Sequence, residues 1–335
     1  MKKHSNTILL SSHDLVGHLN CGHLTGLDLQ VANGTLGKPK VWDSLLDILR
    51  ERGLRHEQAY LDHLKDAGFQ TVTIEGVDIT SDAVAATLKA MEDGTAIIAQ
   101  AALQHGRWTG KADILRRVEK PSRFGDWSYE VIDTKLARET KGGTVLQLSL
   151  YADLLSHMQG VDSEYVYVVA PWSDFTPQSY RVDDYAAFFR QAKIVVEDAT
   201  LLVADKNTYP DLRDYCDICR WRNQCDSRRR ADDHLCLVAG ISKTQINELQ
   251  SNGMNTAKAL AEMLTPMPWK PKRGSPHGFE KVSQQARIQV TARETGKKQL
   301  ETSGFDIQDF LEELGTPSSE KDLKSEKNDT DLRSS

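Results

Sequence analysis

The sequence predicts a mixed α/β domain, in which helices enclose a central sheet, followed by a small helical C-terminal region. Three observations favour this fold class. Strand-like runs rich in β-branched and aromatic residues alternate with helical patterns between about Ile8 and Arg230. The 335 residues, 39% of them apolar, suffice for one large core or two smaller ones. After Cys236 the alternation gives way to short helical runs and prolines.

The elements of the core follow from local patterns. Ser11 to Asp14 form a typical helix cap, and Leu15, Val16 and Leu19 follow it at helical spacing. Apolar residues three and four positions apart predict the later helices, and alternating apolar and polar residues predict the strands. The expected helices lie at residues 41–65, 80–92, 144–158 and 183–205, and the expected strands at 69–74, 96–103, 108–118, 127–135 and 164–170.

The C-terminal region divides by composition. Two short helical runs around Gly253 resemble a helix–hairpin–helix module, with a plain packing subdomain as the alternative. Prolines then predict a linker, and the last twenty residues hold too few apolar groups to fold. The expected parts are a domain at 1–235, the hairpin segment at 236–265, a linker at 266–279, a partly helical extension at 280–315 and a disordered tail at 316–335.

Charge and hydropathy exclude several classes of protein. No apolar run approaches the ~20 residues that span a bilayer, and the stretch at Ile8–Leu10 is too short for a secretory signal. We therefore expect a cytoplasmic protein with no membrane partner. The net charge of −6 means that a nucleic acid would need a local basic patch.

Two polar positions in neighbouring strands suggest a metal site. Side chains alternate along a strand, so Asp133 and Lys135 project from the same face, and the preceding strand offers Asp113. If these strands pair, both carboxylates can bind one Mg²⁺ or Mn²⁺ ion. Lys135 would then hold a nucleophile or neutralise developing charge. An acidic-x-Lys triplet is common, however, so a solvated strand face is the alternative.

Other residues accompany this triplet in a recognisable order. Gly53-x-x-His56 lies in the long helix, Gly110-x-x-Asp113 in one strand, and Asp133-x-Lys135 in the next. Gln147-x-x-x-Tyr151 follows on one helical face. This series resembles the RecB-like branch of the PD-(D/E)XK nuclease superfamily.

The resemblance implies a restriction-endonuclease-like core and a set of roles. His56, Asp113, Asp133 and the Thr134 carbonyl would ligate the metal, with Glu57 as a secondary candidate. Lys135 would be the catalytic lysine, and Gln147 and Tyr151 would complete the catalytic set beside Asp113 and Asp133. The second acid is Asp133 where many relatives have Glu.

Four cysteines form a second pattern. Cys216, Cys219 and Cys225 lie close together, and Cys21 precedes them by 195 residues. Zinc knuckles usually use two close pairs, whereas four thiolates can also hold a [4Fe–4S] cluster. The layout resembles the iron–sulfur staple of RecB-like nucleases. Zinc and unlinked thiols are the alternatives, and Cys236 lies outside the pattern.

Basic and aromatic residues surround the cysteine trio. We expect them to bind nucleic acid through phosphate contacts, with Trp221 stacking on a base. A solvated helix face is the alternative for the arginine run. The candidates are Arg220, Trp221, Arg222, Arg228, Arg229 and Arg230.

The sequence of residues 15–28 and 51–57 resembles that of a bacterial subfamily of RecB-like nucleases. Members of this subfamily continue into a ribonuclease H-like domain and often a helicase. No Gly-x₄-Gly-Lys-Ser/Thr phosphate loop occurs in this sequence, so it contains no such ATP motor. The expected function is a metal-dependent deoxyribonuclease acting on single-stranded DNA or DNA ends, in DNA repair, recombination or mobile-element defence, with a helicase or repair protein as a partner in trans. The alternatives are a non-catalytic DNA-binding or adaptor module and a zinc-stabilised RNA-processing nuclease.

Overall fold

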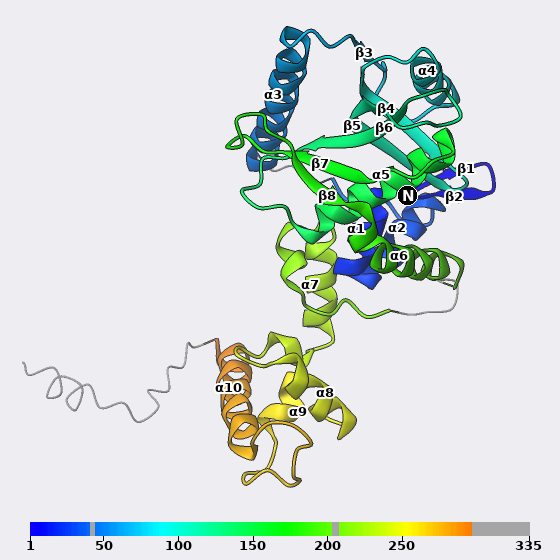
Figure 1. Cartoon of the computed structure of the whole chain (residues 1–335). Coiled ribbons are helices and arrows are strands. Elements are labelled where there is room, and N and C mark those ends of the chain that lie inside the picture. The colour runs from blue at the N-terminus through cyan, green and yellow to red at the C-terminus, as the bar shows by residue number, and fades with distance from the viewer. Residues whose placement is uncertain (41–43, 203–207, 297–335) are drawn as a thin grey trace, which may run out of the picture. The chain divides into compact units, whose positions relative to one another are not determined.

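The computed structural model describes residues 1–40, 44–202 and 208–296, and the chain divides into two units, Met1–Asp226 and a second that begins at Ser227 (Figure 1). Each unit is described by itself. The expected tail at 316–335 and the end of the expected extension, from residue 297, lie outside the described residues.

The first unit is built on a six-stranded mixed sheet. Its strands follow chain order, and all neighbours are antiparallel except β3–β4 and β6–β7, which are parallel. The strands are β3 (Thr71–Thr73), β4 (Ile97–His105), β5 (Trp108–Val118), β6 (Ser128–Thr134), β7 (Tyr165–Val169) and β8 (Gln178–Arg181). A separate two-stranded sheet pairs β1 (Lys2–His4) with β2 (Thr7–Leu9).

Helices flank this sheet, which confirms the expected α/β fold (Figure 1). Ile114 and Ile132 pack in one apolar cluster with residues of α3, whereas their neighbours Leu115 and Val131 pack in another with residues of α5. Adjacent strand residues point to opposite faces, so α3 and α5 lie on opposite sides of the sheet. The helices are α1 (Ser12–Asn20), α2 (Gly22–Ala32), α3 (Ser44–Asp66), α4 (Ser81–Glu92), α5 (Gly142–Gln159) and α6 (Val182–Leu202).

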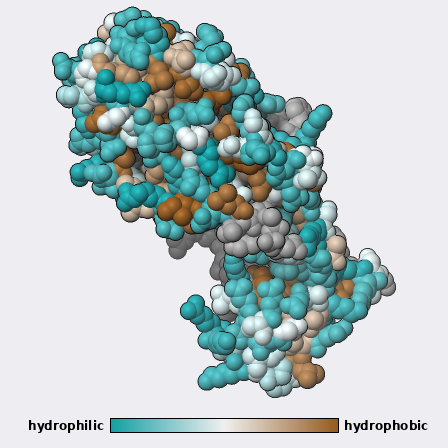
Figure 2. Space-filling model, turned by 90° about the vertical axis from the view of Figure 1, so that its right-hand side faces the viewer, coloured by the Kyte–Doolittle hydropathy of each residue, from teal (hydrophilic) through white to brown (hydrophobic). Residues whose placement is uncertain are grey.

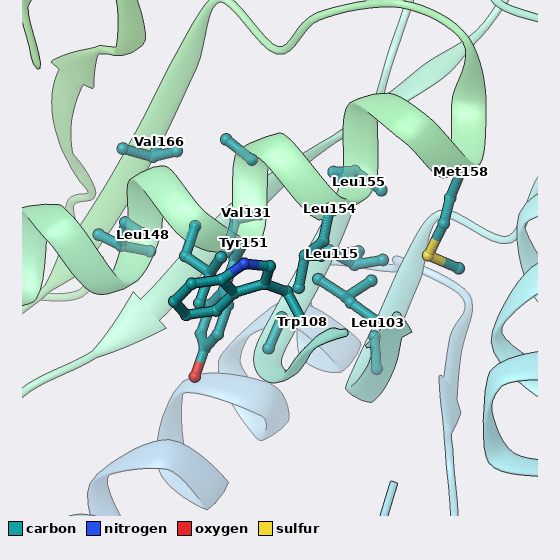
Figure 3. Close-up of a cluster of buried hydrophobic side chains, with 14 of the residues drawn as sticks. Leu103, Trp108, Leu115, Val131, Leu148, Tyr151, Leu154, Leu155, Met158 and Val166 are labelled. Atoms are coloured by element: carbon teal, nitrogen blue, oxygen red, sulfur yellow. The ribbon is translucent and has the colours of Figure 1, made fainter. Parts of the chain in front are cut away.

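The α5 helix is the centre of the larger cluster, which Figure 3 shows in part. Leu148, Leu150, Leu154 and Leu155 are fully buried, because α5 contacts the sheet and also contacts α1 and α6. A helix that is apolar all round is typical of such a position. Gly160, in the left-handed conformation, ends it.

Three features of this unit were not expected from the sequence. Cys21 has an extended backbone and separates α1 from α2, a break that the helical spacing of Leu15, Val16 and Leu19 does not predict. The β1–β2 pair and the edge strand β8 were also missed. The sequence of β8, Gln-Ser-Tyr-Arg, is too polar and short to stand out from a loop.

The second unit has its own helical core. Leu235, Leu249, Leu260 and Phe279 are buried in it. The segment 266–279, expected as a linker, contributes Met267 and Phe279 to this core, since its apolar residues find partners between the prolines. The helices are α8 (Lys243–Ser251), α9 (Ala257–Ala261) and α10 (Pro276–Thr295); α7 (Arg222–Ala231) contains the boundary between the units.

On the face shown in Figure 2, hydrophilic residues predominate and apolar ones are scattered among them, as is usual for globular proteins. Among the described helices, none is long and apolar enough to cross a lipid bilayer.

Candidate active site

The two strands predicted to carry the acidic residues pair as expected. The β5–β6 register joins Ile114 to Ile132 and ends there, so that one step further Asp113 faces Asp133. In place of a further ladder bond, the backbone N–H of Thr134 donates to Asp113 Oδ2 at 2.9 Å, and the Thr134 hydroxyl donates to the same oxygen at 3.1 Å. The Asp113 carboxylate thus acts as the last acceptor of this strand pair, which fixes its orientation.

Asp133 is fully buried, and its electrostatic environment is strongly perturbed. Its Oδ2 lies 2.7 Å from Lys135 Nζ but accepts no hydrogen bond of good geometry, and Gln147 Nε2 lies 3.3 Å from Oδ1. Burial, and then the charge of Asp113, raises the pKa of Asp133 to about 8. A buried carboxylate oxygen with one cationic neighbour is an incompletely satisfied acceptor.

Lys135 remains an ammonium group at this site. Burial opposes its charged form, but the carboxylates of Asp133 and Asp113 outweigh burial and raise the pKa of Lys135. Its backbone N–H donates to the carbonyl of Val169 on β7 at 3.0 Å. The lysine is therefore suited to hold or neutralise negative charge and unsuited to accept a proton.

The α5 helix adds the predicted Gln147–Tyr151 pair. Gln147 Nε2 lies 3.2 Å from the Tyr151 hydroxyl, which in turn lies 3.2 Å from Ser12 Oγ on α1. Burial is the main reason that the pKa of Tyr151 is raised, so the phenol stays neutral. Figure 3 shows the Tyr151 ring within the apolar cluster, beside Trp108, with its hydroxyl at the margin. Sequence reasoning missed Ser12, because a serine at a helix start carries no signal beyond capping.

The two glycines of the sequence motif have different roles in the structure. A Cβ on Gly110 would lie 2.6 and 2.7 Å from two carbons of the Tyr151 ring, closer than packed atoms approach. A Cβ on Gly53, in α3, would meet no atom within 4 Å. Gly110 is therefore what lets Tyr151 lie flat against β5.

His56 and Glu57, on α3, face different partners. His56 Nε2 lies 3.0 Å from the Val169 carbonyl, the same carbonyl that binds the Lys135 N–H, and its ring stacks on Phe175. Glu57 accepts a hydrogen bond from Gln100 Nε2. The contacts above therefore join Asp133, Lys135, Gln147 and Tyr151 directly. Asp113 is joined to them through Thr134, and His56 reaches them only through a carbonyl.

The cysteine segments also come together, although they are 195 residues apart in the sequence. Cys21, Cys219 and Cys225 border one small apolar cluster, built on Leu24, Leu27 and Trp221. Burial first, and then the charges of Cys21 and Cys216, raises the pKa of Cys219. Within residues 1–40, 44–202 and 208–296, no three His, Cys, Asp or Glu side chains are arranged so that they could hold a metal ion.

The basic candidates differ in their accessibility. Trp221 is 1% exposed and its indole N–H donates to Asp28 Oδ1 at 3.0 Å, so the ring cannot stack on a base while it stays packed. Arg220 pairs with the same carboxylate. Arg229 is 2% exposed. The side chains that remain exposed are those of Arg222, Arg228 and Arg230.

Replacing Gly110 by Ala should displace Tyr151 and break its bonds to Gln147 and Ser12. We expect the free energy of unfolding to fall by about 1–3 kcal/mol, as for overpacking in a core, with a change in the near-ultraviolet dichroism of tyrosine. The matched control is Gly53→Ala, which should gain roughly 0.5–1 kcal/mol in the helix interior. Equal effects of the two substitutions in urea denaturation would contradict this packing argument.

The raised pKa of Asp133 makes stability depend on pH. The folded protein retains the Asp133 proton above the ordinary value of 3.8, so the metal-free protein should lose stability as pH rises from there toward about 8. Lys135 is protonated in both states over this range and adds no slope. Asp133→Asn should therefore become more stable relative to the wild type between about pH 5 and pH 8.

Urea denaturation at several pH values, without added metal, measures this difference. The control is Asp126→Asn, since Asp126 is exposed. Parallel pH profiles for the wild type and Asp133→Asn would show that Asp133 is ionised in the folded protein.

Comparison with known proteins bears on most of the first unit. No curated protein matches the sequence significantly. Residues 24–226, more than half of the chain, match the PD-(D/E)XK nuclease superfamily. The match covers both strands that carry Asp113 and Asp133 and the α5 helix beside them. The chain therefore belongs to the PD-(D/E)XK nuclease superfamily.

Proposed function

We propose that the protein is a metal-dependent deoxyribonuclease of the RecB-like branch, which hydrolyses phosphodiester bonds of single-stranded DNA or DNA ends. The observation that carries the proposal is the placement of Asp113 opposite Asp133, with the Lys135 ammonium 2.7 Å from the buried Asp133 oxygen. Two carboxylates and one lysine at the ends of adjacent strands match what phosphodiester hydrolysis needs.

The residues present fit a hard divalent cation such as Mg²⁺ or Mn²⁺. The donors are carboxylate oxygens, and Asp133 Oδ2 is a buried acceptor that the nearby Lys135 ammonium satisfies only in part. Asp113 and Asp133 would hold the ion, which when bound supplies Lewis-acid polarisation of the phosphate and a more acidic water. His56 and the Thr134 carbonyl, which the sequence resemblance adds to the ligands, remain predictions.

The chain's own groups have distinct tasks in this proposal. The charged Lys135 stabilises negative charge that develops on the phosphate. Gln147 orients the Asp133 carboxylate, and the neutral Tyr151 hydroxyl holds Gln147. The Thr134 N–H and hydroxyl keep Asp113 in place. Arg222, Arg228 and Arg230 are the exposed members of the arginine set that we propose to contact phosphates.

The biological setting is proposed from the sequence resemblance. We place the enzyme in the cytoplasm, in DNA repair, recombination or defence against mobile elements, with a helicase or repair protein acting in trans. The experiment below also separates this function from a DNA-binding or adaptor module on the same fold, which would retain DNA without cleaving it.

Asp113→Asn and Lys135→Ala should each reduce cleavage at least about 100-fold. The first removes a proposed metal ligand, and the second removes the positive charge that stabilises the reacting phosphate. The assay uses labelled single-stranded, duplex and flapped DNA, and single-stranded RNA, with Mg²⁺ or Mn²⁺ and with chelator. Asp126→Asn, an exposed aspartate before β6, is the matched control and should keep wild-type rates. Wild-type rates in both site variants, or metal-independent DNA binding without cleavage, would refute the nuclease proposal.

We further propose that Cys21, Cys216, Cys219 and Cys225 hold a [4Fe–4S] cluster that ties the two ends of the first unit together. The support is that Cys21, Cys219 and Cys225 border one apolar cluster, and that Cys21 and Cys216 influence the pKa of Cys219. Thiolates are the ligands that such clusters use. The cluster would be structural, since it would join Cys21 to the segment that holds the other three cysteines.

Anaerobic purification should then give a brown protein with about four iron atoms per chain. Cys21→Ser should lose the iron and lower the melting temperature, whereas Cys236→Ser, outside the pattern, should retain it. A colourless protein that contains zinc instead would contradict the iron–sulfur proposal and favour the zinc-stabilised alternative.

A further inference from the structure

The second unit differs in charge from the chain as a whole. Residues 227–296 contain eleven Lys and Arg side chains against six Asp and Glu, whereas the whole chain has a net charge of −6. This unit lies outside residues 24–226, so the superfamily match assigns it no role. A basic unit in an acidic chain is typical of a surface that contacts a polyanion.

The loop that joins α9 to α10 is held against the core of this unit at alternate positions (Figure 1). Met267 is 8% exposed and belongs to the core cluster. Trp269 packs against the same cluster, and Pro271 is buried. These three anchors within five residues fix the course of the loop where the sequence alone predicts a linker.

The residues beside these anchors carry positive charge. Lys270, Lys272 and Arg273 are all exposed. In the part of the chain that the structure describes, none of the three has an ion pair or a side-chain hydrogen bond. The anchors therefore face the core, while the three cations face solvent without a neutralising partner.

Two carboxylates contact this loop, and both bind its anchors. Glu248 Oε1 accepts a hydrogen bond from the indole N–H of Trp269 at 3.3 Å. Glu280 Oε1 accepts one from the backbone N–H of Met267 at 3.2 Å. The loop thus presents its cations on a backbone that is already ordered, which reduces the entropy lost when a partner binds.

A nucleic-acid backbone is the partner that fits these cations. Phosphates are bound by exposed Lys and Arg side chains, and such contacts need no enclosed pocket. The chain belongs to a nuclease superfamily, so a polymer of phosphates is the substrate that its first unit is proposed to cleave. An acidic protein could offer carboxylates to the same cations, and the experiment below separates the two partners.

On the basis of the nuclease function proposed above, we propose that Lys270, Lys272 and Arg273 form a phosphate-binding loop in the second unit, which holds the backbone of DNA through contacts that the catalytic residues do not make. Phosphate contacts carry no base-edge information, so this loop raises the affinity for DNA without selecting a sequence.

The test is binding of the full chain to a labelled single-stranded DNA, measured by fluorescence anisotropy with chelator present to prevent cleavage. The double substitution Lys270→Ala with Lys272→Ala should weaken binding more than about tenfold at about 0.1 M salt. It should also lower the slope of log K against log salt concentration by about 1.4, because each phosphate contact on a single strand contributes ~0.7.

The chain offers a matched control with the same sequence of three residues. Lys38-Pro39-Lys40, in the first unit, repeats Lys270-Pro271-Lys272, and both of its lysines are exposed. Lys38→Ala with Lys40→Ala removes the same charge and should change binding by less than about twofold, since distant exposed charges are screened by salt. Equal losses in the two double variants would overturn the proposal, because net charge would then explain both.

Two further measurements separate charge from structure and DNA from protein. Lys270→Arg with Lys272→Arg keeps both charges and should retain the affinity and the salt slope of the wild type, since arginine also binds phosphate. Loss of binding in this variant would overturn the phosphate-binding role. Binding of poly-glutamate in preference to DNA, lost in the alanine variant, would overturn the nucleic-acid partner and indicate an acidic protein.

Cleavage distinguishes this inference from the function on which it rests. If the wild type binds DNA through these lysines but cleaves no substrate with Mg²⁺ or Mn²⁺, the proposed nuclease fails and the phosphate-binding loop stands. If the wild type cleaves DNA and the alanine variant binds it with unchanged affinity and salt slope, only the present inference fails.

Discussion

The site depends on one contact, in which the carboxylate of Asp113 replaces a backbone acceptor at the end of the β5–β6 ladder. The Thr134 N–H must bond to something when the strands separate, since a buried N–H without a partner is costly. Asp113 satisfies it at 2.9 Å and also binds the Thr134 hydroxyl. The strands can therefore separate at Asp113 and Asp133 without leaving the Thr134 N–H unpaired, and the two acids are left facing each other.

The charges of the side chains at the point where β5 and β6 separate are balanced only in part. Asp133 is fully buried, and its pKa is raised to about 8 despite the ammonium of Lys135 2.7 Å away. The apolar side chains on both faces of the sheet hold this arrangement, which would relax in a less constrained fold. A carboxylate kept away from its preferred ionisation state is typical of a functional site. Asp133 lies within residues 24–226, which match the PD-(D/E)XK nuclease superfamily.

Helix packing supplies the rest of the geometry. The apolar α5 helix lies against the sheet, and Gly110 leaves the space that the Tyr151 ring fills. This places Gln147 beside Asp133. Asp28, on α2, provides a comparable constraint elsewhere, because its carboxylate binds both Arg220 and the Trp221 indole and so joins segments almost two hundred residues apart.

The sequence alone determined most of the helices and strands around the site and the faces of those elements, because the alternation of apolar and polar residues and helical spacing are local properties. It therefore predicted that Asp133 and Lys135 share a strand face, and that Gln147 and Tyr151 share a helical one. It could not determine that Trp221 is buried against Asp28, that Ser12 binds Tyr151, or that Gln100 turns toward Glu57. Each of these contacts joins residues distant in the chain, and it exists only because strand register and helix packing bring them together. Tertiary structure alone decides such contacts, since no local pattern encodes which distant partner a polar side chain will meet.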